Sequence, residues 1–328
     1  GGRPWSGPGA RRDTPTDSPS RAIGYGTRVP ASFRPLRAGE PVGVVALSGP
    51  VDRERLDEGR RVLEGWGHPV VEAPNVGAST GYLAGDDQAR LDGLNAVLDR
   101  GARVILAARG GYGVTRLLHR LPWPRLVGEQ VCFVGFSDLT PLLNRLPEIG
   151  GAAQVHGPMA AAGLSRSANA RRLRAVLSGE LVGRSLFRVP PGAVIREGCA
   201  TGPSAGWTLA LLAAVAGTPW APDLKGRVLL LEEVNEPVYR IDRMLTQVAA
   251  SGMFRGVKAL ITGSLRGCGR ADRRSEAWRR LAIEAVADTV PIVDGLRFGH
   301  TALNLAFPVG AAVSLDTSRG ELTWSEVG

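Results

Sequence analysis

Short, mostly apolar runs alternate with amphipathic segments along the first half of the chain. The amphipathic segments place apolar residues on one helical face, as Leu91, Leu94 and Leu98 do in the helix that we expect over 86–100. Between such helices the apolar runs predict buried strands, and these cover 42–47, 68–71, 104–108 and 131–134. Continuous apolar strands that alternate with helices are typical of a parallel sheet covered on both faces. The pattern therefore predicts an α/β domain.

The alternation weakens in the second half, where a further unit begins near residue 185. Its strands and helices are expected at 227–232, 236–250, 257–262, 273–287, 291–293, 311–315 and 322–324. The longest uncharged run, 198–222, contains Gly, Pro, Ser and Thr and is expected to hold a buried helix rather than a membrane span. We therefore divide the chain into an N-terminal α/β domain (39–165), a linker with a connecting helix (166–184) and a C-terminal domain (185–328).

Residues 1–38 are rich in Gly, Pro, Ser and Arg without periodicity, so we expect a disordered or non-native tail. The chain shows neither an apolar stretch of the roughly 18 residues that a membrane span needs nor the apolar core of a secretory signal. Its three cysteines, Cys132, Cys199 and Cys268, are too scattered for a disulfide framework or a thiolate metal site. These features predict a cytoplasmic protein without a membrane partner.

The net charge of +9 is typical of nucleic-acid-binding proteins, but its distribution argues against that function. Residues 1–38 hold seven Arg and two Asp, which is +5 of the total and leaves +4 for the rest of the chain. No basic run is interleaved with aromatic residues, as single-strand binding requires. We therefore expect no nucleic-acid partner.

The strongest candidate for chemistry is Ser137, in the sequence Gly-Phe-Ser-Asp between a predicted strand and a predicted helix over 140–146. A serine on such a corner exposes its hydroxyl, and the helix N-terminus beyond it offers unpaired N–H groups to a developing negative charge. The usual nucleophile elbow is G-x-S-x-G, and here Leu139 replaces the last glycine. A helix cap is the alternative role for this serine.

Two further residues complete what acyl transfer needs. Glu232 ends the very apolar strand over 227–232, and His300 lies in a loop next to Gly299. A histidine can take the serine proton while a carboxylate orients its ring. The alternatives are an ion pair for Glu232 and a structural role for His300. No His-x-x-x-His, His-x-x-Glu or Cys pair occurs, so we expect no metal and no cofactor.

The glycine-rich loop 109–113 follows a strand and opens a helix, as a phosphate-binding loop does. It matches neither the dinucleotide fingerprint nor the P-loop. Its glycines could equally bring a backbone N–H close to an oxyanion beside Ser137.

Taken together, these motifs resemble the LD-carboxypeptidase family of serine peptidases, which includes murein tetrapeptide LD-carboxypeptidases and the microcin C self-immunity hydrolases. The resemblance extends from Val42 to Trp324. It is carried by motifs in family order: Ser48-Gly49-Pro50, Tyr82-Leu83-Ala84-Gly85-Asp86-Asp87, Arg109-Gly110-Gly111-Tyr112-Gly113, Gly135-Phe136-Ser137-Asp138-Leu139-Thr140, His156-Gly157-Pro158-Met159, Leu231-Glu232-Glu233, Tyr239-Arg240-Ile241-Asp242-Arg243 and Phe298-Gly299-His300-Thr301.

The resemblance implies a fold and a set of roles. It implies a flavodoxin-like N-terminal domain and a swivelling, β-rich C-terminal domain, commonly in a homodimer. It makes Ser137 the nucleophile, His300 the base and Glu232 the third member of the triad. Its oxyanion hole uses the N–H of Asp138 and one from the loop 109–113, where we favour Gly111.

The implied substrate is a murein tetrapeptide, cut between an L-centre and its C-terminal D-alanine during cell-wall recycling. Arg109 and Arg240 are candidates for binding the substrate carboxylate. Where family members often show Gly-Gly-Asn, this chain has Ala205-Gly206-Trp207. An indole there could stack on a nucleobase or fill the core, so a peptidyl or aminoacyl nucleotide of the microcin type is the alternative substrate. A non-catalytic, two-domain ligand-binding protein is the alternative of another class.

Overall fold

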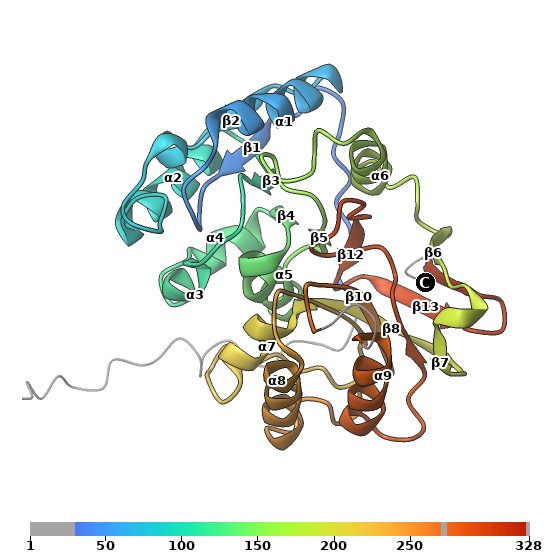
Figure 1. Cartoon of the computed structure of the whole chain (residues 1–328). Coiled ribbons are helices and arrows are strands. Elements are labelled where there is room, and N and C mark those ends of the chain that lie inside the picture. Colours follow the sequence, from blue (N-terminus) through green and yellow to red (C-terminus); the bar gives the residue numbers. More distant parts are fainter. Residues whose placement is uncertain (1–29, 270–273, 326–328) are drawn as a thin grey trace, which may run out of the picture.

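The computed structural model describes residues 30–269 and 274–325, which form two sheets (Figure 1). In the N-terminal half, parallel strands follow the order β2-β1-β3-β4-β5. They are β1 (Val42–Val45), β2 (Val70–Glu72), β3 (Val104–Ala107), β4 (Cys132–Gly135) and β5 (Gln154–His156). This is the strand order of flavodoxin-like folds, in which ligands bind beyond the carboxyl ends of the strands. The apolar runs predicted these strands because β1, β3 and β4 are buried at every position.

Local capping fixes where the helices of this half begin. Asp52 accepts a hydrogen bond from the N–H of Arg55 at the start of α1, and Asp86 accepts one from Ala89 at the start of α2. The helices are α1 (Arg53–Gly65), α2 (Asp87–Asp99), α3 (Val114–Leu117), α4 (Trp123–Gly128), α5 (Thr140–Glu148) and α6 (Ser167–Leu177), with 3-10 turns η1 (Pro74–Gly77) and η2 (Ser137–Leu139). The connecting helix expected in the linker is α6.

The C-terminal half forms a mixed sheet in the order β6-β14-β13-β8-β9-β10-β11-β7, parallel from β8 to β11 and antiparallel toward its edges. Its strands are β6 (Ser185–Arg188), β7 (Val194–Arg196), β8 (Cys199–Thr208), β9 (Val228–Val234), β10 (Ala259–Arg266), β11 (Ile292–Val293), β13 (Ala312–Asp316) and β14 (Glu321–Trp324). The helices α7 (Leu209–Val215), α8 (Val238–Ala250) and α9 (Arg274–Ala285) pack side by side (Figure 1), and η3 (Pro191–Ala193) is a single turn. The prediction of a parallel-sheet domain followed by a β-rich domain is confirmed.

One strand returns from the C-terminal half to the N-terminal sheet. β12 (Phe307–Val309) pairs antiparallel with β5 and places Phe307 opposite His156. The boundary drawn at residue 185 therefore does not separate the two sheets completely. A local hydrophobic pattern does not specify which sheet an edge strand joins, because the pairing connects residues far apart in the chain.

The uncharged run 198–222 contains the buried helix that we predicted, α7, and in addition the strand β8, which we did not predict. The last five residues of β8 are buried between neighbouring strands. A central strand of this kind is as free of charged residues as a buried helix, so the absence of charge does not distinguish them. No helix within 30–269 and 274–325 is long and apolar enough to span a bilayer.

Residues 30–38, which we assigned to the tail, run along the body of the protein. The N–H of Ala31 donates to the carbonyl of Gly310 (2.9 Å), and the N–H of Leu36 donates to Leu177 (2.8 Å). Phe33 packs edge to face against Trp324, with ring centroids 4.9 Å apart. These isolated anchors among polar residues produce no periodic signal. The rest of the predicted tail, 1–29, lies outside the described residues.

The two halves are joined where α5 packs against β8. The side-chain amide of Asn144 donates to the carbonyl of Gly206 (2.7 Å) and accepts from its N–H (3.2 Å). Nearby, Glu148 at the end of α5 pairs with Arg227 at 3.6 Å. Because α5 follows Ser137 directly, these contacts connect the candidate nucleophile to the C-terminal half.

Candidate active site

Ser137 lies at the corner between β4 and α5, and its backbone φ is +61°. Holding a non-glycine residue in this left-handed region costs about 1–2 kcal/mol, and such strain is concentrated at functional sites. The turn is held by the Thr140 hydroxyl, which donates to the carbonyl of Ser137 at 2.9 Å. This geometry is that of a nucleophile elbow, despite Leu139 in place of the usual glycine.

Glu232 and His300 are brought together by the C-terminal half. The Nδ1 atom of His300 lies 2.7 Å from Oε2 of Glu232, and the backbone N–H of His300 donates to the same oxygen at 3.1 Å. The carboxylate is fully buried near the end of β9, and its other oxygen accepts the hydroxyl of Thr208. A hydrogen bond from Nδ1–H to a carboxylate leaves Nε2 of the ring as a proton acceptor.

Ser137 and His300 face one pocket of about 260 Å³, although they come from different halves of the chain. Glu232 lies behind His300 and does not line this pocket. The lining residues are Asp52, Arg55, Arg109, Gly110, Gly111, Phe136, Ser137, Met159, Ala161, Ala162 and His300. The pocket therefore places a serine hydroxyl and a carboxylate-held imidazole in the same small volume.

The loop 109–113 passes close to the serine. A side chain on Gly110 would bring its Cβ within 3.2 Å of Ser137 Cβ and 3.3 Å of its Oγ. Gly111 has a φ of +126°, which favours glycine. Within the described residues, the N–H groups of Gly110, Gly111 and Asp138 have no hydrogen-bond acceptor. They are therefore free to donate to an oxyanion formed next to Ser137.

The side chain of Asp138 has a structural role at this corner. Its buried carboxylate accepts the hydroxyl of Ser48 at 2.6 Å and the N–H of Val114 at 2.9 Å. Burial raises the pKa of Asp138, while these hydrogen bonds act in the opposite direction. The carboxylate thus connects the segments that follow β1, β3 and β4, which all end at the same edge of the sheet.

The three residues proposed for substrate contact lie in different places. Arg109 lines the pocket, and its guanidinium donates to the carbonyl of Pro50 at 3.1 Å. Arg240 is half-exposed on α8, where it pairs with Glu236 at 3.0 Å, and it does not line the pocket. Trp207 is 1% exposed within the C-terminal hydrophobic core, because the pleat of β8 directs it there, and it does not line the pocket either.

Asp52 and Arg55 line the pocket although sequence reasoning did not select them. Both lie at the start of α1, directly after the segment that follows β1. The signal that could have found them is topological, since the residues after each parallel strand gather at one edge of the sheet.

His156 packs behind His300 and does not line the pocket. Its ring stacks on Phe307 with centroids 4.6 Å apart and lies next to Phe136, which in turn contacts His300. Burial lowers the pKa of His156 to about 4, and among the described residues neither ring nitrogen has a hydrogen-bond partner. The neutral ring therefore serves as part of the wall behind His300.

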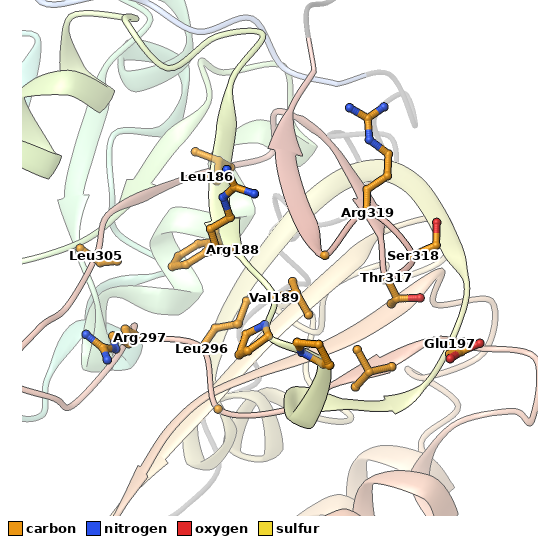
Figure 2. Close-up of a pocket in the computed structure, with 16 residues that line it drawn as sticks. Leu186, Arg188, Val189, Glu197, Leu296, Arg297, Leu305, Thr317, Ser318 and Arg319 are labelled. Carbon is orange, nitrogen blue, oxygen red and sulfur yellow. The ribbon is translucent and has the colours of Figure 1, made fainter.

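A larger cavity of about 800 Å³ lies in the C-terminal half (Figure 2). Ser137, Glu232 and His300 are absent from its lining, so it is not the place for the chemistry described above. Its lining includes Arg297 and Leu305, which are joined by a 2.9 Å backbone hydrogen bond at the base of the loop that carries His300. No cluster of three or more His, Cys, Asp or Glu residues suited to a metal occurs in the described ranges.

A strained serine on a strand–helix corner, facing a histidine held by a buried carboxylate, is the arrangement of serine hydrolases. Comparison with known proteins gives the family. A profile of the LD-carboxypeptidase N-terminal domain matches residues 42–157, and one of the LD-carboxypeptidase C-terminal domain matches 201–315. The chain therefore belongs to the LD-carboxypeptidase family, a family of peptidases, as its motifs indicated.

Individual relatives agree with this family. The chain is 41% identical to a Streptomyces coelicolor protein named "putative carboxypeptidase", over 88% of this chain and 94% of that protein. It is 32% identical to the murein tetrapeptide carboxypeptidase of Pseudomonas aeruginosa, over 86% and 94% of the two chains. The structure of the microcin C7 self immunity protein MccF superposes with a TM-score of 0.81 at 20% identity, over 90% of this chain and 99% of that one. The last comparison confirms the two-domain fold.

Proposed function

We propose that this protein is a serine-type LD-carboxypeptidase that removes the C-terminal D-alanine of murein tetrapeptides. The observation that carries the proposal is the 2.7 Å contact between His300 and Glu232, with His300 facing the same pocket as Ser137. The 32% identical relative named murein tetrapeptide carboxypeptidase supports the choice of substrate. The proposal includes the cytoplasm as the compartment and a homodimer as the assembly.

In the proposed mechanism, Ser137 Oγ attacks the carbonyl of the diamino acid in the third position while His300 Nε2 takes the hydroxyl proton. Glu232 keeps the ring in the required tautomer and stabilises its cation. The N–H groups of Asp138 and Gly111 stabilise the oxyanion. His300 then gives the proton to the leaving amine of D-alanine. Water, activated by the same histidine, hydrolyses the acyl-enzyme and regenerates Ser137.

A carboxypeptidase must also recognise a free carboxylate, and Arg109 has the position for this. It lines the pocket and its guanidinium is held near Pro50, whereas Arg240 lies on α8 and is paired with Glu236. We expect Arg109→Gln to raise KM for the tetrapeptide by about tenfold or more, the scale of a lost charge-assisted hydrogen bond. Arg240→Gln is the control and should leave KM unchanged.

The direct test incubates the protein with a muramyl tetrapeptide and measures free D-alanine. We expect release by the wild type and a loss of roughly a thousandfold or more in Ser137→Ala. Equal rates in the two proteins would rule out the serine mechanism. An aminoacyl sulfamoyl nucleotide is tested in parallel, because turnover of that compound without release of D-alanine would favour the alternative substrate. Labelling of Ser137 by a serine-directed phosphonate separates both enzymes from a non-catalytic binding protein.

The buried position of Trp207 helps to choose between the murein peptide and the aminoacyl nucleotide as the substrate. It was the one feature of the sequence that favoured a nucleotide, and its indole is enclosed by the C-terminal core. A ring that is 1% exposed has no face on which a base could stack. This observation supports the murein peptide as the substrate.

A further inference from the structure

An acidic and a basic side chain lie next to each other at the wall of the pocket, where α1 begins. Asp52 and Arg55 both line the pocket that contains Ser137 and His300. Their side chains are 58% and 72% exposed, and the nearest charged atoms, Arg55 Nε and Asp52 Oδ2, lie 3.8 Å apart. This separation is too long for a hydrogen bond. The Arg55 guanidinium and Oδ2 of Asp52 therefore keep their hydrogen-bonding capacity for a ligand.

The neighbouring arginine in the same turn shows the contrast. Arg53 donates from Nη1 to Glu72 and from Nη2 to Asp57, each at 2.6 Å. The guanidinium of Arg55 makes no hydrogen bond within the described residues. Arg53 thus stabilises the surface around α1, whereas Arg55 is directed toward the pocket and has no such role.

The acidic partner is held in place by the fold. Asp52 is the N-cap of α1, and its Oδ1 accepts the N–H of Arg55 at 3.2 Å. Oδ2 is left for other partners. The cap thus fixes the carboxylate of Asp52 on the helix that also carries Arg55.

A side-by-side carboxylate and guanidinium complement a ligand that carries an ammonium and a carboxylate on the same carbon. Arg109 already provides a cation for the C-terminal carboxylate of the proposed substrate. The pair Asp52 and Arg55 therefore suits a second, zwitterionic group. In murein tetrapeptides the third residue is a diamino acid, and its side chain ends either in an ammonium alone, as in lysine, or in an amino acid head, as in diaminopimelate.

We propose that Asp52 and Arg55 form a subsite for the zwitterionic side-chain terminus of diaminopimelate in the third position, an inference that rests on the proposed function. Arg55 binds the side-chain carboxylate and Asp52 binds the side-chain ammonium. Both interactions are charge-assisted hydrogen bonds at a partly solvated site, so we expect discrimination of about tenfold in kcat/KM rather than a thousandfold.

The test compares three tetrapeptides that differ only in the third residue: diaminopimelate, diaminopimelate with its side-chain carboxyl amidated, and lysine. The wild type should prefer the first about tenfold in kcat/KM. Arg55→Gln should remove this preference and leave the rate on the lysine peptide unchanged. Asp52→Asn, which retains a good N-cap, should lower kcat/KM on all three peptides, because each carries the ammonium.

Two substitutions on the same helix serve as matched controls. Glu54→Gln changes an exposed acid next to Asp52, and Arg61→Gln changes an exposed base two turns away, and neither residue lines the pocket. Both variants should retain the wild-type preference. Thermal unfolding of all four variants confirms that the helix is intact.

The outcomes separate this inference from the proposed function. Equal kcat/KM of the wild type on the three peptides, or a preference that persists in Arg55→Gln, overturns the subsite and leaves the carboxypeptidase standing. Failure to release D-alanine from any of the three refutes the proposed function and the subsite with it. Loss of the preference in Arg55→Gln but not in Arg61→Gln supports the subsite.

Discussion

Thr208→Val tests whether the hydroxyl that donates to Glu232 positions this carboxylate for the proposed reaction. Thr208 is buried beneath the site, and its hydroxyl is the sole donor to Oε1 of Glu232 among the described residues. Both remaining donors, the N–H and Nδ1 of His300, use Oε2. Valine has nearly the same shape, so the change removes a hydrogen bond from a buried carboxylate without opening a cavity.

The structure sets the size of the expected effect. A hydrogen bond to a charged group contributes about 1.5–3 kcal/mol, and about 1.4 kcal/mol corresponds to a tenfold change in rate. If Glu232 loses its orientation, kcat should fall by about 10- to 100-fold. KM should stay the same, because Thr208 does not line the pocket. The free energy of unfolding should fall by a similar amount, about 1.5–3 kcal/mol.

The assay is release of D-alanine at saturating and limiting tetrapeptide, with urea unfolding of the same preparations. Thr208→Ser retains the hydroxyl and should restore most of kcat, even though it loses a methyl group from the core. A Thr208→Val enzyme with wild-type kcat would refute the positioning role. So would a Thr208→Ser enzyme as slow as the valine variant, since the methyl group rather than the hydroxyl would then matter.

Three further predictions concern the loop beside the serine and two buried titratable groups. Gly110→Ala should lower kcat about tenfold or more, because the new Cβ would press on Ser137 at 3.2 Å, whereas Gly65→Ala has open space and serves as the control. Burial raises the pKa of Glu148 to about 7. Between about pH 4.5 and pH 7 the folded state therefore keeps Glu148 protonated, whereas the unfolded state has lost that proton. The stability of the wild type relative to Glu148→Gln should therefore fall as pH rises from about 4.5 to about 7. Burial lowers the pKa of His156 to about 4, so the wild type should lose up to about 3 kcal/mol relative to His156→Leu as pH falls from about 6.5 to about 4.

Kinetics of D-alanine release test the first of these predictions, and urea unfolding at a series of pH values tests the other two. Unchanged kcat in Gly110→Ala would show that the loop 109–113 moves to make room for the new Cβ and does not hold Ser137 in position. Parallel pH profiles for the wild type and Glu148→Gln would mean that the carboxyl group titrates alike in the folded and unfolded states. The same result for His156→Leu would mean that water reaches the imidazole.

The sequence predicted the N-terminal sheet well because its strands are buried on both faces. β1, β3 and β4 consist of continuous apolar residues, and a parallel sheet covered by helices is the usual reason for such runs. The same argument failed for β8, since an uncharged segment of that length fits a central strand and a buried helix equally well. Chain length and apolar content do not distinguish the two, whereas pairing with β9 and β13 does.

The candidate site could be predicted where the signal is local in sequence, and it could not be predicted where it depends on contacts between distant residues. Ser137 was selected because a strand, a serine and a helix are neighbours in sequence. Glu232 was selected at the end of an apolar strand and His300 in a glycine-flanked loop, both also by the family motifs, and the contact between them arises only in the fold. Arg55 lacks any local signal, because an exposed arginine in a first helical turn is common. For Trp207 the sequence left two roles open, stacking on a nucleobase and filling the core, and its strand position buries it in the core.

The course of the chain explains how residues from two sheets form one site. Ser137 follows β4, whereas His300 lies between β11 of the C-terminal sheet and β12, which pairs with β5 of the N-terminal sheet. In that pairing His156 lies between Gly135 of β4 and Phe307 of β12. The loop that carries His300 is thereby anchored to the strand next to the one that ends at the serine. A second connection joins the helix after the serine to the C-terminal sheet. Asn144 of α5 forms hydrogen bonds with Gly206 of β8. Two residues further along β8, the hydroxyl of Thr208 donates to Glu232. The serine and the histidine–glutamate pair are therefore each braced by the opposite half, so that the distance between them is set by sheet pairing rather than by a flexible link.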